Sequence, residues 1–322
     1  MKTRRLGWTG VELTTIGLGT WAMGGGGWAF AWGPQDDRES IQAIHRSMDL
    51  GVNWIDTAPA YGLGHAEEIL GRVLKHLSEK PFVATKCGRS WDENRQLFGS
   101  LKKEVICREI ETSLRRLQIE AIDLYQVHWP QPEADIEEAW SAIARAVKEG
   151  KVRYAGVSNY SVQQLKRIQP IHPVASVQPP YSLLARAAEE ELLAYCAAQN
   201  IGVVAYSPMQ KGLLTGKFSR ERVPQLAEDD HRRRDPQFQE PLLGANLELV
   251  EGLQRLAERN GKSVAELAIA WVLRRPEVTA AIVGARKPSQ IEETVGAAEW
   301  TLSPQDLAII DELLKKRQEQ AR

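Results

Sequence analysis

The fold of this chain follows from one short stretch of sequence, VNWIDTAPAY at residues 52–61. The stretch begins as an apolar run, turns at Ala58-Pro59, and leaves a carboxylate, Asp56, five positions before a phenol, Tyr61. A strand rises about 3.3 Å per residue, so we expect Asp56 to end a strand and Tyr61 to lie on the loop beyond it. In a barrel of alternating strands and helices, that end of the sheet carries the chemistry.

Composition predicts a soluble globular protein with a large core. The chain has 322 residues, of which 43% are hydrophobic and 26% charged, and its net charge is −1. This balance predicts neither nucleic acid nor an anionic membrane as a partner. Three scattered cysteines are too few for a disulfide framework or a zinc site, so we expect reduced thiols and no metal. Without an apolar leader or a run of ~18 apolar residues, we expect a cytoplasmic protein, and a monomer by default.

Short apolar runs alternate with helical patterns along the whole chain. The expected strands cover residues 16–21, 52–56, 82–86, 123–127, 154–157, 176–178, 201–206 and 280–283. The expected helices include residues 36–50, 65–77, 101–117, 136–149, 161 onward and 187–200, two that follow residue 244, and two that begin near 288 and 303. Eight strands alternating with helices predict a (β/α)8 TIM barrel. The alternative is a doubly wound open sheet, which the lack of Gly-x-Gly-x-x-Gly after the first strand makes less favoured.

Two segments lie outside this alternation. Residues 4–13 predict a small hairpin with Thr9-Gly10 in its turn, which would act as a plug or lid on a larger body. Residues 207–244 form a long irregular segment, and loops of that length are usually functional or disordered. Within it the basic run at residues 231–234 is interleaved with aspartates, which predicts a solvated loop.

A glycine-rich loop follows the first strand at residues 24–33. No Gly-Lys-Ser/Thr follows its four consecutive glycines, and the dinucleotide pattern requires a helix directly after, so a phosphate cradle is disfavoured. Two interpretations stay open. The segment is either a flexible loop, or a substrate loop whose Trp28, Phe30 and Trp32 wall an apolar pocket.

Four side chains capable of acid–base chemistry follow three of the expected strands. Asp56 and Tyr61 follow the second strand, Lys86 ends the third, and His128 follows the fourth. A lone lysine at a strand end is usually solvated and a lone histidine usually structural. At corresponding ends of one barrel, however, all four would converge on the same face.

The sequence resembles the aldo-keto reductases over nearly its whole length, and within them the bacterial branch of general-stress and inositol-locus reductases. The matching motifs, in the family's order, are GLGTWAMGG (17–25), DTAPAYG (56–62), ATKCG (84–88), QVHWP (126–130), GVSNY (156–160), AYSPM and KGLLTGK (205–217), and VGARKPSQIEE (283–293). The resemblance implies a single barrel domain over residues 1–322 that reduces a small aldehyde or ketone to an alcohol with NAD(P)H.

The resemblance also implies roles for the four convergent side chains. Tyr61 would donate the proton to the alkoxide left by hydride transfer. A free phenol has a pKa of about 10, so a cation is needed to lower it, and Lys86 would be that cation. Asp56 would hold Lys86 charged and oriented, and His128 would hydrogen-bond the carbonyl oxygen.

Cofactor and substrate residues are likewise implied by the family's motifs. The cofactor set comprises Thr20, Trp21, Ser158, Asn159, Gln178, Tyr206, Ser207, Pro208, Met209, Lys211, Gly212, Leu213, Lys217, Gly284, Arg286, Gln290, Glu293 and Thr294. In that set Ser158, Asn159 and Gln178 would bind the carboxamide of the nicotinamide, and Tyr206 would stack on its ring. Residues 207–217 would form the loop that closes over the pyrophosphate. Arg286 would bind a 2′-phosphate, which favours NADPH over NADH. The substrate pocket would be walled by Trp28, Phe30, Trp32, Trp91 and Trp129. Two residues depart from the family's pattern: Thr294 stands where the family often has Asn, and Val283 where it often has Pro. These departures affect the contacts expected at the adenine end of the cofactor and leave the expected chemistry unchanged.

Two other functions compete with a carbonyl reductase. A cofactor-binding sensor or regulatory subunit would be favoured by a broken catalytic set, and here the four residue types are intact. A barrel lyase or isomerase would need a metal or a substrate phosphate, and no carboxylate/His cluster in the sequence predicts a metal site.

Overall fold

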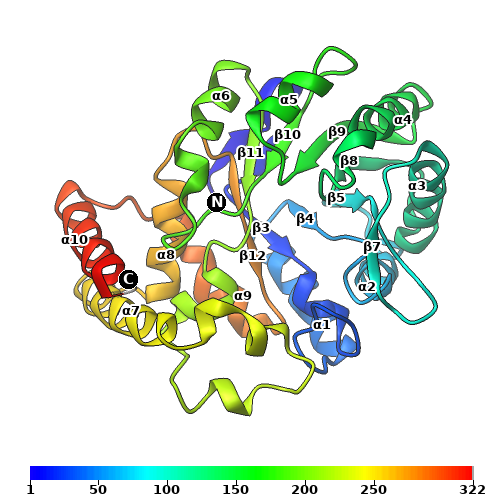
Figure 1. The fold of residues 1–322 in the computed structure, drawn as a ribbon. Helices are drawn as coiled ribbons and strands as arrows, with labels where there is room; N and C mark the ends of the chain where they lie inside the picture. The colour runs from blue at the N-terminus through cyan, green and yellow to red at the C-terminus, as the bar shows by residue number, and fades with distance from the viewer. Residues whose placement is uncertain (321–322) are drawn as a thin grey trace.

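The chain closes into a barrel of eight parallel strands (Figure 1). We describe residues 1–320 from a computed structural model. The barrel strands are β3 (Ile16–Gly19), β4 (Trp54–Asp56), β5 (Phe82–Cys87), β8 (Ile122–Val127), β9 (Val152–Ser158), β10 (Ser176–Gln178), β11 (Gly202–Ala205) and β12 (Ala280–Gly284). Each strand pairs in parallel with the next, and β12 pairs with β3. Because the sheet closes on itself, the (β/α)8 prediction is confirmed and the open-sheet alternative is wrong.

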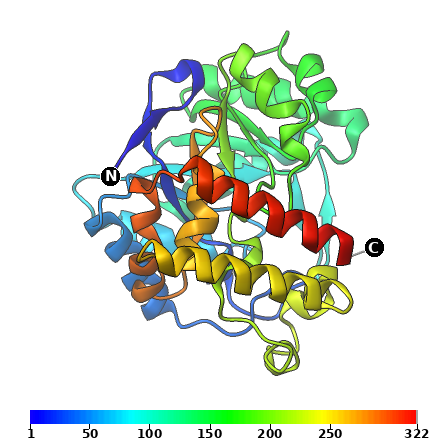
Figure 2. The same ribbon diagram turned by 90° about the vertical axis from the view of Figure 1, so that its left-hand side faces the viewer.

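Helices surround the strands on the outside of the barrel, as Figure 1 shows. They are α1 (Asp37–Asp49), α2 (His65–Leu74), α3 (Lys103–Leu117), α4 (Ile136–Lys148), α5 (Val162–Ile168), α6 (Leu192–Ala198), α7 (Leu242–Arg259), α8 (Val264–Leu273), α9 (Pro288–Val295) and α10 (Pro304–Gln320). Capping boxes at Ser161 and Ser263 begin α5 and α8, as the sequence predicts. Figure 2 shows α10 lying beside α7, where Gly252 allows a close approach because a Cβ there would lie 2.5 Å from Leu313.

The predicted helix at residues 187–200 is divided into a 3-10 turn, η4 (Ala187–Glu189), and the shorter α6. Tertiary contacts account for the break. The Glu189 carboxylate accepts hydrogen bonds from Arg186, Arg274 and the Tyr181 hydroxyl, which hold the chain in place before α6 begins. Local propensity yields to these contacts, as it often does.

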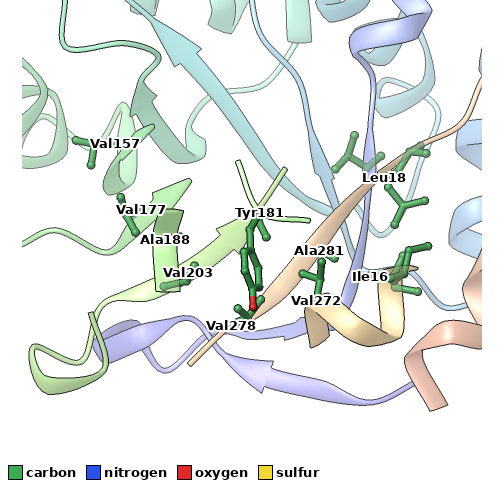
Figure 3. Close-up of a cluster of buried hydrophobic side chains, with 14 of the residues drawn as sticks. Ile16, Leu18, Val157, Val177, Tyr181, Ala188, Val203, Val272, Val278 and Ala281 are labelled. Carbon is green, nitrogen blue, oxygen red and sulfur yellow. The ribbon is translucent and has the colours of Figure 1, made fainter. Parts of the chain in front are cut away.

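Side chains on the barrel strands alternate between two cores. The outward set packs under the helices, and Figure 3 shows part of it, including Ile16, Leu18, Val157, Val177, Val203 and Ala281. The inward set fills the barrel and includes Trp54, Ala84, Leu124, Val204 and Ile282. The alternation follows from the two-residue period of a strand. At Gly17 a Cβ would point into the interior and lie 2.0 Å from the Trp54 ring, so this position requires glycine.

The N-terminal hairpin closes one end of the barrel. Strands β1 (Thr3–Arg5) and β2 (Glu12–Thr14) pair antiparallel, and a 3-10 turn, η1 (Gly7–Thr9), makes the connection longer than the sequence predicts. Leu6 and Leu13 are fully buried against the inward set of barrel side chains. The hairpin (dark blue in Figure 2) is therefore a plug, which confirms one of the two predicted roles.

Two loop regions at the other end carry more structure than the sequence indicates. The connection between β5 and α3 contains a small antiparallel pair, β6 (Arg89–Trp91) and β7 (Leu97–Gly99), which the sequence analysis missed. The long segment after β11 winds through the 3-10 turns η5 (Gln210–Thr215), η6 (Val223–Gln225), η7 (His231–Arg234) and η8 (Pro236–Phe238). Across the described residues, no helix has both the length and the apolar character that a membrane crossing requires.

Candidate active site

Strand period places two charged side chains inside the carboxyl end of the barrel. Asp56 lies two residues after the inward-facing Trp54, and Lys86 lies two residues after the inward-facing Ala84. Asp56 is paired in register with Ala84, so Lys86 extends one step beyond the carboxylate on the neighbouring strand. The side chains that fill the barrel are thus apolar near the plug and polar at the opposite end.

Lys86 is the centre of the polar cluster, and its side chain is fully buried. Its ammonium donates to Asp56 Oδ1 at 2.6 Å, to the Thr57 carbonyl at 2.9 Å and to the Tyr61 hydroxyl at 3.1 Å. These three acceptors use all three N–H groups of an ammonium. The sequence prediction that Asp56, Tyr61 and Lys86 meet is therefore matched by the geometry.

The Asp56 carboxylate is also held from its other side. Its Oδ2 accepts a hydrogen bond from Gln178 Nε2 at 2.9 Å and lies 3.4 Å from Gln126 Nε2. Asp56 is 2% exposed, so these contacts replace water around a buried charge. Both carboxylate oxygens are bound, which fixes the direction from which Asp56 approaches Lys86.

Burial dominates the titration of the cluster. It lowers the pKa of Lys86, while the charge of Asp56 and its hydrogen bond act in the opposite direction. It raises the pKa of the Tyr61 phenol well above 10, and the charge of Asp56 raises it further. The predicted lowering of the Tyr61 pKa is therefore wrong. Burial of the phenol and the charge of Asp56 raise this pKa by more than the Lys86 ammonium lowers it. Tyr61 is protonated throughout the neutral range.

His128 stands beside Tyr61, with the ring centroids 5.8 Å apart and the rings nearly perpendicular. Its backbone N–H donates to the Cys87 carbonyl at 2.9 Å, which ties the end of β8 to β5. Burial lowers the pKa of His128 well below 6.5, with the charges of Lys86 and Arg89 acting in the same direction. The imidazole is therefore neutral. Its Nδ1 is buried and has no hydrogen-bond partner among the described residues.

A chain of hydrogen bonds joins the predicted nicotinamide-binding side chains to His128. The Tyr206 hydroxyl donates to Asn159 Oδ1 at 2.9 Å, and Asn159 Nδ2 donates to the His128 carbonyl at 3.0 Å. Ser158 Oγ donates to the Gln178 carbonyl at 2.9 Å. On the opposite side of the barrel mouth, Thr20 is buried, and its hydroxyl donates to Thr57 Oγ1 at 2.8 Å.

The predicted pyrophosphate loop, which includes Ser207, Pro208, Met209, Lys211, Gly212, Leu213 and Lys217, has an unusual backbone. Ser207, Gln210 and Lys211 take left-handed φ values between 46° and 55°, and Gly212 has φ 89°. The Lys211 ammonium pairs with Asp235 at 2.6 Å, and the Lys217 ammonium pairs with Glu293 on α9. The loop is thus held to the rest of the chain at both ends.

At the predicted adenine end, Arg286 is turned toward the glycine-rich loop. Its guanidinium donates to the Gln35 side chain and to the carbonyls of Trp32 and Pro34. Gln290 Oε1 accepts from the backbone N–H groups of Arg286 and Lys287. The buried Thr294 donates its hydroxyl to the Gln290 carbonyl at 3.0 Å.

The residue set fits a nicotinamide cofactor in its chemistry. The Asn159 amide is hydrogen-bonded to Tyr206, to Ser158 and to the His128 carbonyl, and the predicted adenine end carries the basic side chains of Arg286 and Lys287. A Cβ on Gly284, which ends β12, would meet no atom of its surroundings closer than 4.0 Å. The backbone at this strand end therefore leaves room for a bound group.

Three of the five predicted pocket aromatics, Trp28, Phe30 and Trp32, lie in the loop at residues 24–33, which contacts Trp21. Trp21 stacks on Tyr61 with centroids 6.2 Å apart and meets Trp32 edge-on at 5.3 Å. Trp28 lies edge-on to Phe30 within the same loop, at 6.2 Å. We call residues 24–33 the aromatic loop. Its rings pack against one another and against Trp21, and its interpretation as a substrate loop stays a prediction.

Trp91 and Trp129 take other partners. The Arg116 guanidinium of α3 lies 5.4 Å from the Trp91 ring, and the Arg89 guanidinium lies 5.6 Å from the Trp129 ring. Neither ring has an aromatic contact with Tyr61, Trp21 or His128 within the part of the chain that the structure describes. Both tryptophans therefore lie apart from the aromatic group at Tyr61.

The charged run predicted to be a solvated loop is exposed at Arg233 and Arg234, but Asp230 and His231 are buried, so the prediction is wrong for these two residues. Asp230 is 2% exposed and His231 is 6% exposed. His231 stacks on Trp21 at 4.9 Å, and its Nδ1 lies 2.9 Å from the Ala31 carbonyl. Arg232 forms an ion pair with Asp230 and lies 4.5 Å from the Trp32 ring.

Further bonds tie these two loops together. Asp229 accepts from the Gly27 N–H at 2.7 Å, and Arg234 donates to the Ala29 carbonyl at 3.0 Å. We call residues 229–235 the clamp segment. Its basic and acidic residues neutralise one another, so composition alone gives no sign that His231 reaches Trp21.

Comparisons with known proteins agree with this geometry. A family model described as the Aldo/keto reductase family matches residues 15–315. The aldo-keto reductase YhdN of Bacillus subtilis (strain 168) is 42% identical, covering 95% of this chain and 92% of that protein. The NADH-specific methylglyoxal reductase of Escherichia coli (strain K12) is 36% identical, covering 97% and 98%. The solved structure of the glycerol dehydrogenase AKR11B4 from Gluconobacter oxydans superimposes with a TM-score of 0.88 at 39% identity, covering 98% of this chain and 95% of that one.

Proposed function

This chain belongs to the aldo/keto reductase family and is an NAD(P)H-dependent oxidoreductase, and we propose that it reduces aldehydes and ketones with NADPH and that Tyr61 donates the proton. The observation that carries the proposal is the position of Lys86. Its ammonium lies 2.6 Å from the Asp56 carboxylate and 3.1 Å from the Tyr61 hydroxyl, inside a barrel end that excludes water.

The reduced nicotinamide, when bound, supplies the hydride that reaches the carbonyl carbon. The oxygen then carries a developing negative charge, and the Tyr61 hydroxyl transfers its proton to that oxygen. The phenolate left on Tyr61 is stabilised by the Lys86 ammonium, and the charge of Lys86 is balanced in turn by Asp56. Because the Lys86 ammonium is already in position, no side chain or solvent has to move to stabilise the phenolate as it forms.

The high pKa of Tyr61 is consistent with this role. An alkoxide is a base of about the strength of hydroxide, whose conjugate acid, water, has a pKa of about 15.7. The raised pKa of the Tyr61 phenol keeps it protonated until this strong base forms beside it. Lys86 acts on the phenolate as it forms.

We assign the orientation of the carbonyl to His128. Its pKa lies well below 6.5, so the ring is neutral at physiological pH and can donate an N–H to oxygen without adding a positive charge. Trp21 and the aromatic loop would hold the apolar part of the substrate, since Trp21 stacks on Tyr61 and Trp32 packs edge-on against Trp21.

We assign the nicotinamide to Ser158, Asn159, Gln178 and Tyr206, and the 2′-phosphate to Arg286. A guanidinium binds a phosphate through two parallel hydrogen bonds, which the 2′-hydroxyl of NADH cannot match. The relative named NADH-specific shows that such a preference varies among similar chains.

The test of this function is the rate of NADPH oxidation with a reactive aromatic aldehyde, in wild type and in Tyr61→Phe. Losing a positioned proton donor is expected to lower kcat about 10²–10⁴-fold. The dissociation constant for NADPH, followed by tryptophan fluorescence, should change little, because Tyr61 contacts the substrate oxygen. A kcat within a few-fold of wild type would remove Tyr61 from the role of acid.

A further inference from the structure

We propose that Gln35 sets the selectivity between NADPH and NADH, because it competes with the 2′-phosphate for the Arg286 guanidinium. The inference rests on the proposed function, in which Arg286 binds that phosphate. Gln35 lies just after the aromatic loop and directly before Asp36, the residue that caps α1. It is 251 positions from Arg286 in the sequence, and the barrel brings the two side chains together.

Every nitrogen of the Arg286 guanidinium is bound to this neighbouring segment. Nε donates to Gln35 Oε1, Nη2 donates to the Pro34 carbonyl, and Nη1 donates to the Trp32 carbonyl at 3.1 Å. Gln35 returns the contact, since its Nε2 donates to the Arg286 carbonyl at 3.0 Å. Gln35 Nε2 is fixed further by the Ser40 hydroxyl at 3.0 Å.

This arrangement occupies the edge of the guanidinium that a phosphate would use. A bidentate contact takes two parallel N–H groups, such as those of Nε and one Nη. Here Gln35 and Pro34 hold that pair. A 2′-phosphate must therefore displace two neutral acceptors before it gains its own bonds, and its net advantage over a 2′-hydroxyl is reduced accordingly.

Three other cations in this region of the described chain already have carboxylate partners. Lys287 is paired with Glu39 at 3.2 Å, and Lys217 is paired with Glu293. Arg232 is paired with the buried Asp230. The exchange at Arg286 is thus the step in which the protein distinguishes the two cofactors, and Gln35 decides how much that exchange costs.

Two substitutions at one position test the proposal, because they move NADPH affinity in opposite directions. Gln35→Leu removes the oxygen that accepts from Arg286 Nε, so this N–H is free for the 2′-phosphate. NADPH should then bind about 3- to 10-fold more tightly. In Gln35→Glu a carboxylate pairs with Arg286 and repels the phosphate, so NADPH should bind about tenfold or more weakly. NADH binding should stay within about twofold in both. The readout is the dissociation constant of each cofactor, measured by tryptophan fluorescence without substrate.

Two further variants separate the possible explanations. Asp229→Ala releases the aromatic loop at Gly27 without touching Arg286, so it should leave the ratio of the two dissociation constants unchanged. In an Arg286→Ala background, Gln35→Leu should no longer alter that ratio, because the shared partner is gone.

The outcomes distinguish this inference from the proposed function. If Arg286→Ala weakens NADPH selectively while both Gln35 variants keep the wild-type ratio, Gln35 plays no part in selectivity and the inference fails alone. If Arg286→Ala weakens both cofactors equally, the assignment of the 2′-phosphate fails and the inference fails with it. Parallel changes for both cofactors in the Gln35 variants would show a role in loop structure only, which also overturns the inference.

Discussion

Lys86 is a fully buried cation that donates a hydrogen bond to a buried carboxylate, Asp56. Such a pair is costly to desolvate, and hydrophobic replacements are often as stable. Chemistry explains this pair better than stability does, since the third N–H of the Lys86 ammonium is directed at the Tyr61 hydroxyl. The Lys86–Asp56 pair therefore serves the chemistry at Tyr61 rather than the stability of the barrel.

Removing Lys86 alone should destabilise the protein strongly. Lys86→Met leaves Asp56 as an unpaired buried charge, which costs about 3–5 kcal/mol in free energy of unfolding. The double variant Lys86→Met/Asp56→Asn removes both charges and should recover much of that stability. Urea denaturation measures both effects, and neither variant should regain wild-type turnover. If the double variant is no more stable than the single one, the pair is not the source of the loss.

Sequence periodicity was sufficient to place Asp56, Lys86 and His128, because each lies at a strand end and strand residues alternate with period two. It could not place Arg286 or His231. Their partners, Gln35 and Ala31, are 251 and 200 positions away, so the contacts depend on loop paths rather than on local pattern. The sequence-based expectation for the Tyr61 pKa also gave too much weight to Lys86, because a motif does not show how deeply its residues are buried.

At the scale of elements, strands and helices were predictable where an apolar face repeats. The division of residues 187–200 was not, because the Glu189 contacts that cause it come from Arg274 on a distant segment. The pair β6–β7 was not predictable either. It is held in part by Glu109 on α3, whose carboxylate accepts from the Gly88 N–H and the Ser90 hydroxyl at 2.7 Å each.

The N-terminal plug should affect stability and leave catalysis unchanged. Leu13 is fully buried inside the end of the barrel opposite the polar cluster, so Leu13→Ala should cost about 2–5 kcal/mol. Val11→Ala, on the partly buried margin of the same cluster, is the matched control and should cost less. The measurements are urea denaturation and kcat/KM well below the unfolding transition. A large fall in kcat/KM for Leu13→Ala would mean that the plug transmits an effect to the active end.

At the scale of the whole molecule, the two ends of the barrel are closed in different ways. One end is filled by the apolar hairpin, and the other is covered by the aromatic loop and the clamp segment through hydrogen bonds and stacking. The clamp segment brings His231 into this cover from the long segment after β11. A buried histidine in such a place links the stability of the whole fold to pH.

Folding should therefore weaken as the pH falls below 6.5, in part through His231. Burial lowers the pKa of His231 from 6.5 to about 4. Above pH 6.5 the imidazole is neutral in both the folded and the unfolded chain, so it has no pH-dependent effect. Between pH 6.5 and 4 the His231 imidazole is protonated in the unfolded chain and neutral in the folded chain. The free energy of unfolding therefore falls by about 1.4 kcal/mol for each pH unit toward 4.

The variant His231→Asn isolates this contribution, because an amide can still donate to the Ala31 carbonyl but does not titrate. Buried carboxyls such as Glu67 and Glu109 have raised pKa values and act with the opposite sign, but they are common to both proteins. We expect wild type to lose stability relative to the variant by about 1.4 kcal/mol for each pH unit from 6.5 toward 4. Urea denaturation at several pH values gives the two curves. Parallel curves over this range would show that His231 gains a proton as readily in the folded protein as in the unfolded chain, and that the cover over the barrel end admits charge.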